Sequence, residues 1–328
     1  MSLAGQWMNR LADASIFFSF DRSGFRRHQR RFQAADLEVD LAGKRCLVTG
    51  ANSGLGRAAA QALAFLGAEV WLLCRSEERG RVAERDIRMG TGNDRGRLEI
   101  IDLASRASIL RFVERLGDRP VDVLINNAGV LPDQRIESED GMELTWATNV
   151  VGPFLLTWKL VPHLQRAAGG RVINVSSGGM YTQQLDLRDV HWLERPFDGV
   201  VAYAQSKRAE VILTELWADR LRDRGISVNS MHPGWADTAG VRHSLPRFWR
   251  LTQGRLRSPR EGADTIVWLA ACERIAGETG QFWFDRQAVA THLLRTRERS
   301  GDRQRLWELC RQQAGLSAGS RLSAGSLG

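Results

Sequence analysis

The sequence predicts an α/β protein built on one doubly wound parallel sheet of about seven strands, with helices on both faces. Short apolar runs alternate with longer segments of helical period. The runs are continuously apolar, as expected of parallel strands that are covered on both faces. A glycine-rich turn connects the first run to an alanine-rich helix. Together these observations indicate a single Rossmann-type sheet.

The alternation of strands and helices predicts a central domain at residues 41–295. A cationic, aromatic arm at 1–40 precedes it, and a C-terminal helix with a flexible tail at 296–328 follows it. The tail is expected to be flexible because Leu-Ser-Ala-Gly-Ser occurs twice within it. Buried strands are expected at 45–49, 69–74, 98–101, 121–125, 171–175 and 227–231, with a last strand at 281–285.

The formal net charge of +8 is concentrated at the two ends of the chain. Residues 1–35 hold six arginines against two acids, residues 286–328 hold eight against three, and the rest holds 32 basic against 33 acidic side chains. This distribution excludes a uniformly basic domain, and no nucleic-acid partner is expected. Arginines and phenylalanines occur together at 17–32. This segment either packs its aromatic side chains on the domain or makes a peripheral contact with an anionic membrane.

Composition also predicts the cellular compartment. No run of 18 apolar residues occurs, and the N-terminus lacks the residue order of a signal peptide. The four cysteines form no Cys-x-x-Cys pair, so neither a disulfide framework nor a metal site is expected. We therefore expect a cytoplasmic protein, with the arm as the segment suited to a membrane surface.

The turn at residues 49–56, Thr-Gly-Ala-Asn-Ser-Gly-Leu-Gly, predicts a dinucleotide site. Gly50 permits the tight turn, Gly54 lets backbone amides approach a pyrophosphate, and Gly56 lets the next helix lie close to the sheet. Free N–H groups and the dipole at the start of that helix favour bound phosphate. The expected cofactor contacts in this turn are Gly50, Asn52, Ser53, Gly54, Leu55 and Gly56.

The end of the second strand predicts the choice of cofactor. Cys74-Arg75 stands where a carboxylate would bond the adenine ribose of NAD. The planar guanidinium of Arg75 can instead pair with a 2′-phosphate. We therefore expect NADP(H) to be preferred, with NAD(H) as the alternative if Arg75 is an ordinary solvated arginine.

Tyr203 and Lys207 form a candidate catalytic pair. Their i, i+4 spacing in a segment of helical period puts the phenol and the ammonium on one face. The chain has only two tyrosines and three lysines, so this pairing is improbable by chance. A nearby cation stabilises a phenolate and makes a tyrosine usable for proton transfer near neutral pH. A surface tyrosine with an unrelated lysine is the alternative.

Further motifs accompany the glycine turn and the Tyr203/Lys207 pair. They are Asn126-Asn127-Ala128-Gly129, Thr148-Asn149-Val150-Val151-Gly152, Ser176-Ser177 and Pro233-Gly234. In this order, over roughly residues 40–285, the motifs resemble the classical short-chain dehydrogenase/reductase family. The resemblance implies a seven-stranded Rossmann-type sheet and hydride transfer between NAD(P) and an alcohol or a carbonyl.

Four other motifs narrow the resemblance. They are Ser177-Gly178-Gly179-Met180, Pro196-Phe197-Asp198-Gly199, Met231 to Thr238, and Glu261-Gly262-Ala263-Asp264-Thr265. They are similar to a branch of the family related to the retinol dehydrogenase-like reductases. The likeness includes residues before 40 and implies no settled substrate.

The resemblance implies a role for each matched residue. Tyr203 would be the general acid and base, and Lys207 would lower its pKa and bond the nicotinamide ribose. Ser177, in preference to Ser176, would hydrogen-bond the substrate oxygen. Asn149 would support a water that relays protons. Further cofactor contacts are implied for Asp102, Leu103, Asn127, Ala128, Gly129, Pro233, Gly234 and Thr238.

Two of these residues have a structural alternative. Asp102 could cap the helix that starts near Ser105, and Asn149 could satisfy backbone groups inside its own helix.

The 25 residues between Ser177 and Tyr203 predict an insertion over the site. Aromatic residues in and after it either line an apolar substrate cleft or pack in the core. They are Trp192, Phe197, Trp235, Phe248 and Trp249.

The motifs together predict an NADP(H)-dependent oxidoreductase, such as a carbonyl reductase, that acts on a hydrophobic carbonyl or alcohol. A dinucleotide-binding regulatory or scaffold protein without turnover is the alternative. A homodimer is expected through an apolar face of the helix that carries Tyr203, unless the sheet or the arm buries this face. The face consists of Val211, Ile212, Leu213, Leu216 and Trp217.

Overall fold

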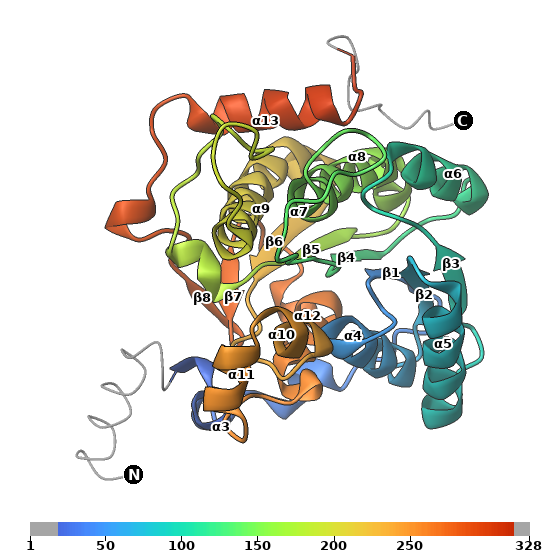
Figure 1. Cartoon of the computed structure of the whole chain (residues 1–328). Helices are drawn as coiled ribbons and strands as arrows, with labels where there is room; N and C mark the ends of the chain where they lie inside the picture. The colour runs from blue at the N-terminus through green and yellow to red at the C-terminus, as the bar shows by residue number, and fades with distance from the viewer. Residues whose placement is uncertain (1–18, 318–328) are drawn as a thin grey trace.

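The computed structural model describes residues 19–317, which form one eight-stranded sheet with helices on both faces (Figure 1). The strand order is β3-β2-β1-β4-β5-β6-β7-β8. The first seven strands pair in parallel, and only β8 runs antiparallel to its neighbour. The predicted Rossmann-type fold class is confirmed, because the strand order reverses between β1 and β4.

The strand positions follow the apolar runs closely. The strands are β1 Arg45–Thr49, β2 Glu69–Cys74, β3 Arg97–Ile100, β4 Val123–Asn126, β5 Arg171–Val175, β6 Ser227–Met231, β7 Phe282–Phe284 and β8 Gln287–Val289. The run predicted at 121–125 begins too early, because the N–H of Val121 donates to His163 O and not to a neighbouring strand. Pairing with β1 starts only at Val123.

The eighth strand was not predicted. Asp285 and Arg286 adopt positive φ values of 46° and 60°, which turn the chain back from β7 into a short hairpin. Tight hairpins of this kind usually carry Asn-Gly or Asp-Gly, so Asp-Arg gives little sequence signal for a turn. The predicted strand at 281–285 therefore ends earlier, at Phe284.

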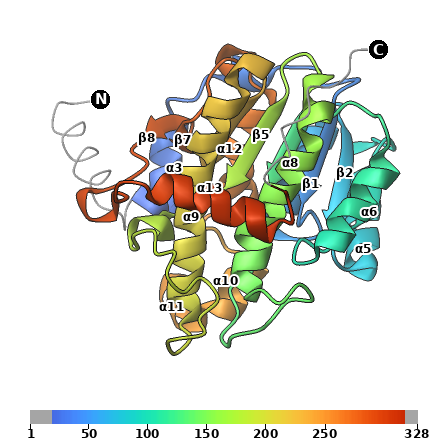
Figure 2. The same ribbon diagram turned by 90° about the horizontal axis from the view of Figure 1, so that it is seen from above.

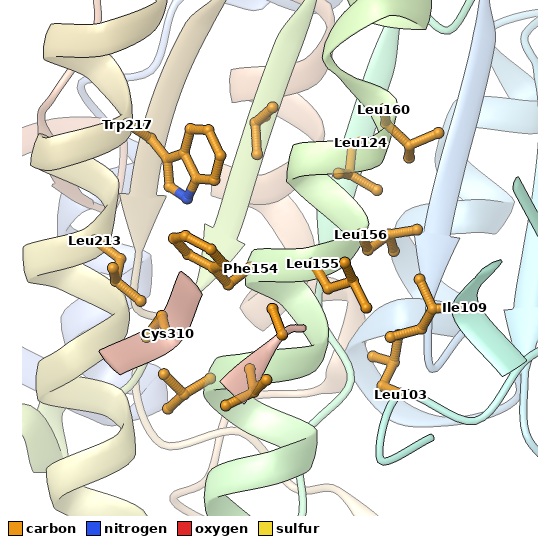
Figure 3. Packing of buried hydrophobic residues seen from close by; sticks show 14 of the residues in the cluster. Leu103, Ile109, Leu124, Phe154, Leu155, Leu156, Leu160, Leu213, Trp217 and Cys310 are labelled. Atoms are coloured by element: carbon orange, nitrogen blue, oxygen red, sulfur yellow. The ribbon is translucent and has the colours of Figure 1, made fainter. Parts of the chain in front are cut away.

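Two helical layers enclose the sheet (Figure 1). The layer on one face includes α4 Gly54–Phe65, α5 Glu77–Thr91 and α12 Pro259–Ala271. The layer on the other face includes α6 Arg106–Leu116, α8 Gly152–Gln165 and α9 Gly199–Leu221. The buried residues of α8 and α9 meet the sheet in one apolar cluster (Figure 3). Leu124, Phe154, Leu156 and Trp217 are each at most 2% exposed within it.

The apolar face of α9 is buried within the chain. The helix α13 Asp302–Gln313 lies across α9 (Figure 2), and the rings of Trp217 and Trp307 are 4.7 Å apart. The face on which a homodimer was expected is thus covered by the sheet and by α13. The alternative prediction, that the sheet or the N-terminal arm buries this face, was correct for the sheet. The second covering element is α13 and not the arm. Most of the predicted flexible tail, 318–328, lies outside the described residues.

The described part of the N-terminal arm packs on the main domain. Asp21 caps the helix α3 Arg22–Gln29 by accepting from the N–H groups of Ser23 and Gly24. The ring of Phe20 lies 4.3 Å from His232, and Phe25 is 3% exposed. This packing agrees with one of the two interpretations of the arm. Residues 1–18, including Phe17 and Phe18, lie outside the described residues.

The surface of α3 remains cationic, with Arg26 and Arg30 exposed. A 3₁₀ turn, η1 Ala34–Leu37, follows α3 and brings Asp36 against Trp268 and Arg274. Between residues 19 and 317, no helix combines the length and the apolar composition needed to cross a membrane.

A buried ion pair, Arg257–Asp285, joins the arm to the sheet. Two hydrogen bonds of 2.6 and 2.9 Å connect the side chains, and Asp285 also accepts from His28 Nδ1 at 2.6 Å. Burial alone would raise the pKa of Asp285, but His28 and Arg257 outweigh it and the pKa is lowered. The Arg257 guanidinium further donates to the carbonyl oxygens of Ser19 and Asp21. One arginine thus connects the arm to the β7–β8 hairpin.

We expect Asp285→Asn to lower the free energy of unfolding by about 3–5 kcal/mol, because it leaves the buried Arg257 without its counter-ion. Chemical denaturation of the purified chain would measure this loss. Arg81→Ala is the control, because Arg81 is exposed and pairs with Glu77 at the surface. The control should cost less than about 1 kcal/mol. Equal losses in the two variants would contradict the role given to Asp285.

Candidate active site

The predicted site residues converge on a cleft at the carboxyl ends of the central strands. The cleft consists of two cavities of about 330 and 400 Å³. The first lies over the glycine turn and the second over Ser177 and Tyr203. The two adjoin each other, because both are lined by Leu55, Asn127, Gly129, Val130, Thr238 and Gly240. The cleft opens at the switch point of the sheet, where open α/β folds bind ligands.

The glycine turn has the backbone geometry that its sequence predicts. Gly50 and Gly54 have φ values of 66° and 53°, which disfavour any residue with a side chain. A Cβ on Gly56 would lie 2.4 Å from Asn127 Nδ2 and 2.6 Å from Gly50 O. The side chain of Ser53 makes no capping hydrogen bond, so the first N–H groups of α4 remain available to an anion.

Asn127 and Thr49 fasten β4 to β1 beneath this turn. Thr49 Oγ1 accepts from the N–H groups of Asn127 and Ala128 at 2.9 and 3.0 Å. Asn127 Nδ2 donates to Thr49 O at 2.8 Å. Asn127 and Ala128 therefore line the first cavity, as expected, while the amide of Asn127 is used to hold the turn.

Two arginines stand at the far end of the first cavity. Arg75 lines it and is exposed, as expected for a contact with a 2′-phosphate. Arg79, in the first turn of α5, also lines the cavity and was missed. Arg79 follows Arg75 by four residues, just after the end of β2. This spacing is the sequence signal that could have identified Arg79.

Asp102 and Leu103 line the same cavity beyond β3. The carboxylate of Asp102 accepts from the N–H of Ala104 at 2.9 Å. The alternative that Asp102 caps the following helix is wrong, because Ser105 itself is the N-cap of α6. Leu103 is buried, and its carbonyl oxygen would meet a Cβ on Gly152 at 2.2 Å.

Asn149 lies in a single π-helical turn, Ala147–Val151, between α7 Leu144–Trp146 and α8. Its Oδ1 accepts from Val130 N at 2.9 Å, and its Nδ2 donates to Val130 O and to Ser206 Oγ. The alternative that Asn149 serves its own helix is wrong, since Val130 follows β4. Asn149 is fully buried and lines neither cavity, so the π-turn directs its amide to Val130 and Ser206 behind the cleft.

The two serines after β5 both line the second cavity, but their hydroxyl groups have different partners. Ser176 Oγ donates to Lys207 O at 2.9 Å and is buried against α9. Ser177 lines the second cavity, where its Oγ accepts from Gly179 N at 3.2 Å. This geometry supports the choice of Ser177 over Ser176 as the candidate substrate contact.

Tyr203 and Lys207 both line the second cavity from one face of α9. Lys207 Nζ lies 5.5 Å from the centroid of the Tyr203 ring. The ammonium donates to Val175 O at 3.0 Å and to Glu210 Oε1 at 2.8 Å, which leaves one of its three N–H groups for a ligand. Burial alone would lower the pKa of Lys207, but Glu210 and Tyr203 outweigh it and the pKa is raised.

The Pro233-Gly234 turn forms the wall opposite Ser177. Gly234 has a φ of 71°, and its N–H donates to the Nδ1 of His232 at 3.1 Å. Burial lowers the pKa of His232 to about 3, so this ring is a neutral acceptor. Thr238 caps the short helix α10 Ala239–Ser244, and its methyl carbon would meet a Cβ on Gly54 at 3.3 Å.

The second cavity is mostly apolar where it leaves Tyr203. Trp235 and Phe248 line it, as predicted, together with aliphatic side chains that were missed: Leu131, Val200, Val241 and Leu245. The other three aromatic residues pack elsewhere. Trp192 is 6% exposed and contacts Phe197, and Trp249 Nε1 donates to Asp237. These aliphatic residues were missed because they are separated in sequence and meet only in the fold.

The residues of the first cavity fit a dinucleotide. A Cβ on Gly56 would displace the amide of Asn127, so the turn has no room for a side chain beneath a pyrophosphate. The available N–H groups of α4 can bind the phosphates, and Arg75 and Arg79 provide positive charge at the far end.

Comparisons with known proteins agree with this geometry. The family model for short chain dehydrogenases matches residues 44–247. The chain belongs to the short-chain dehydrogenase family. Human dehydrogenase/reductase SDR family member 12 is 43% identical over 276 residues, which cover 84% of this chain and 86% of the relative. Mouse retinol dehydrogenase 13 is 36% identical over 264 residues and covers 76% and 78%. The expected branch of the family is thereby confirmed.

Solved structures support the same assignment. An uncharacterised protein from Mycobacterium paratuberculosis superposes with a TM-score of 0.69 at 28% identity, over 87% of this chain and 98% of the other. A short chain dehydrogenase from Shigella flexneri in complex with NADP gives a TM-score of 0.62 at 27% identity, over 75% and 98%. This short-chain dehydrogenase is therefore an NAD(P)-dependent oxidoreductase that acts on a small molecule.

We expect Gly56→Ala to weaken the binding of NADPH at least tenfold and to lower the free energy of unfolding by about 1–3 kcal/mol, because its Cβ overlaps backbone and side-chain atoms. Fluorescence titration and denaturation would measure the two effects. Gly277→Ala is the control, since a Cβ there meets no heavy atom within 4 Å. Normal binding by Gly56→Ala would refute the close approach of α4 to the sheet.

Proposed function

We propose that this short-chain dehydrogenase reduces an apolar carbonyl, or oxidises the corresponding alcohol, with NADP(H) as the preferred cofactor. One observation supports this most directly: Ser177, Tyr203 and Lys207 line an apolar cavity that adjoins the cavity over the glycine turn. A non-catalytic scaffold is disfavoured because it has no need for these three side chains beside an apolar cavity.

The proposed chemistry follows from the positions of the polar groups. Bound nicotinamide would supply or accept the hydride at the carbonyl carbon. Tyr203 donates its phenolic proton to the carbonyl oxygen as negative charge develops there, and Ser177 Oγ donates a hydrogen bond to the same atom. Lys207 supplies the positive charge that favours a tyrosinate after the transfer. In the oxidation, Tyr203 accepts the proton instead.

The proposed substrate class follows from the cavity wall. Leu131, Val241, Leu245 and Phe248 surround the space beyond Tyr203 and offer few hydrogen bonds. A substrate with an apolar body and a single carbonyl or hydroxyl group suits this wall. The mouse and human relatives named retinol dehydrogenases are consistent with a substrate of this kind.

We expect Tyr203→Phe to lower kcat at least about 100-fold for any carbonyl that the wild type reduces, because the proton donor is lost. NADPH oxidation would be followed by its absorbance, and NADPH binding by fluorescence should stay within twofold. Tyr181→Phe is the matched control, since Tyr181 is the other tyrosine and its hydroxyl donates to Ala290 O. Full turnover by Tyr203→Phe would exclude Tyr203 as the acid.

We expect Arg75→Ala to weaken NADPH about 10- to 100-fold and NADH less than threefold, since only NADPH carries the phosphate that a guanidinium would pair with. Direct titration with both cofactors measures the ratio. Arg81→Ala, which removes an arginine from the exposed side of α5, should leave both affinities unchanged. Tighter binding of NADH than NADPH to the wild type would overturn the preference.

A further inference from the structure

Glu210 is a buried carboxylate directly behind the candidate catalytic lysine. It lies one turn after Lys207 on α9 and is 7% exposed. Its Oε1 accepts from Lys207 Nζ at 2.8 Å. Its Oε2 is buried and has no hydrogen-bond partner among the described residues. Burying a carboxylate with one unsatisfied oxygen is costly, so this placement calls for an explanation beyond packing.

Among residues 19–317, Lys207 is the charged group whose attraction affects the pKa of Glu210. The strand β6 and the π-turn packed against α9 carry no ionisable residue. Four ionisable groups on or next to other neighbouring elements bond other partners. Arg171 of β5 bonds Cys272 O, Tyr181 of the 3₁₀ turn Gly178–Tyr181 bonds Ala290 O, Arg303 of α13 pairs with Glu215, and His232 accepts from Gly234 N.

The charge on Glu210 must therefore influence Tyr203 through Lys207 and across the helix. An ammonium with an ionised carboxylate at 2.8 Å exerts a weaker positive field on its surroundings than a lone ammonium does. Lys207 Nζ is 5.5 Å from the Tyr203 ring, so the phenol experiences this difference. Burial raises the pKa of Glu210 to about 7, against the attraction of Lys207. The carboxylate thus offsets the lysine mainly above neutral pH.

We propose that Glu210 is a positioning residue that holds the Lys207 ammonium and, when ionised, offsets its charge, so that Tyr203 keeps its proton to higher pH. The proton-donating form of Tyr203 then persists into the alkaline range, and with it the capacity for carbonyl reduction. This inference rests on the proposed function, in which Tyr203 is the acid. It adds a residue that sets the pH range of the reaction.

The chain allows a direct test without substrate or cofactor, because it contains only two tyrosines. Replacing Tyr181 by Phe leaves Tyr203 as the single tyrosine, so in this background the ultraviolet absorbance of tyrosinate reports Tyr203. All variants are therefore compared in the Tyr181→Phe background. The apo protein would be titrated as wild type, Glu210→Gln, Glu210→Asp and Glu298→Gln. Glu298 is the matched control, since it pairs with Arg208 on the same helix.

Glu210→Gln should lower the tyrosinate midpoint by about one pH unit. This magnitude follows from a charge about 10 Å away, seven residues along a helix, at an effective dielectric constant of about 20. Glu210→Asp and Glu298→Gln should stay close to the wild type. An unchanged midpoint in Glu210→Gln overturns the proposal. A raised midpoint also overturns it, because Lys207 would then have lost its proton with its counter-ion.

A second measurement separates this inference from the proposed reaction. For any carbonyl that the wild type reduces, the alkaline limit of kcat/KM should fall by the same pH interval in Glu210→Gln, with activities below about pH 6 unchanged. A shifted tyrosinate midpoint without turnover of any carbonyl would refute the reaction and leave the role of Glu210 intact. If Glu210→Gln does not fold, as judged by thermal melting, Glu210→Asn carries the same expectations.

Discussion

The tie between Thr49 and Asn127 is the interaction on which the site depends. One hydroxyl and one amide join β1 to β4 at the point where the sheet reverses its strand order. On one side of this tie, Gly56 brings α4 close to the sheet. On the other side, a Cβ on Gly129 would lie 3.4 Å from Lys207 Nζ and 3.5 Å from Asn149 Oδ1. The two cavities of the cleft share Asn127 because both lie next to this junction.

Much of the fold and most of the candidate site could be predicted from the sequence. Buried parallel strands can be recognised in the sequence as continuous apolar runs. Glycines with positive φ are required where the turn at residues 49–56 is tightest. The β7–β8 hairpin could not be predicted, because Asp285 takes its conformation from its ion pair with Arg257 and not from local turn preference. Trp192 could not be assigned between cleft and core, since aromatic side chains serve both equally well.

Glu210 illustrates a different limit of sequence reasoning. Its spacing from Lys207 is visible in the sequence, but a Lys/Glu pair at i, i+3 is usually a surface pair of small effect. Only the burial of both side chains inside the fold converts this pair into a group that matters for Tyr203. The missed Arg79 is similar, because its relevance depends on how α5 is oriented over the end of β2.

The bonds that join the N-terminal arm to Arg257 and Asp285 affect the order in which the chain folds during synthesis. The arm is synthesised before the domain, whereas Arg257 and Asp285, which bond Ser19, Asp21 and His28, follow more than 230 residues later. During translation these bonds can form only after most of the domain has emerged. Contacts that span more than 230 residues also close late, because loop closure over such a separation is slow. Docking of the arm against the Pro233-Gly234 wall is therefore a late step, and a ribosome-bound chain that stops before residue 257 lacks the guanidinium that bonds the carbonyl oxygens of Ser19 and Asp21.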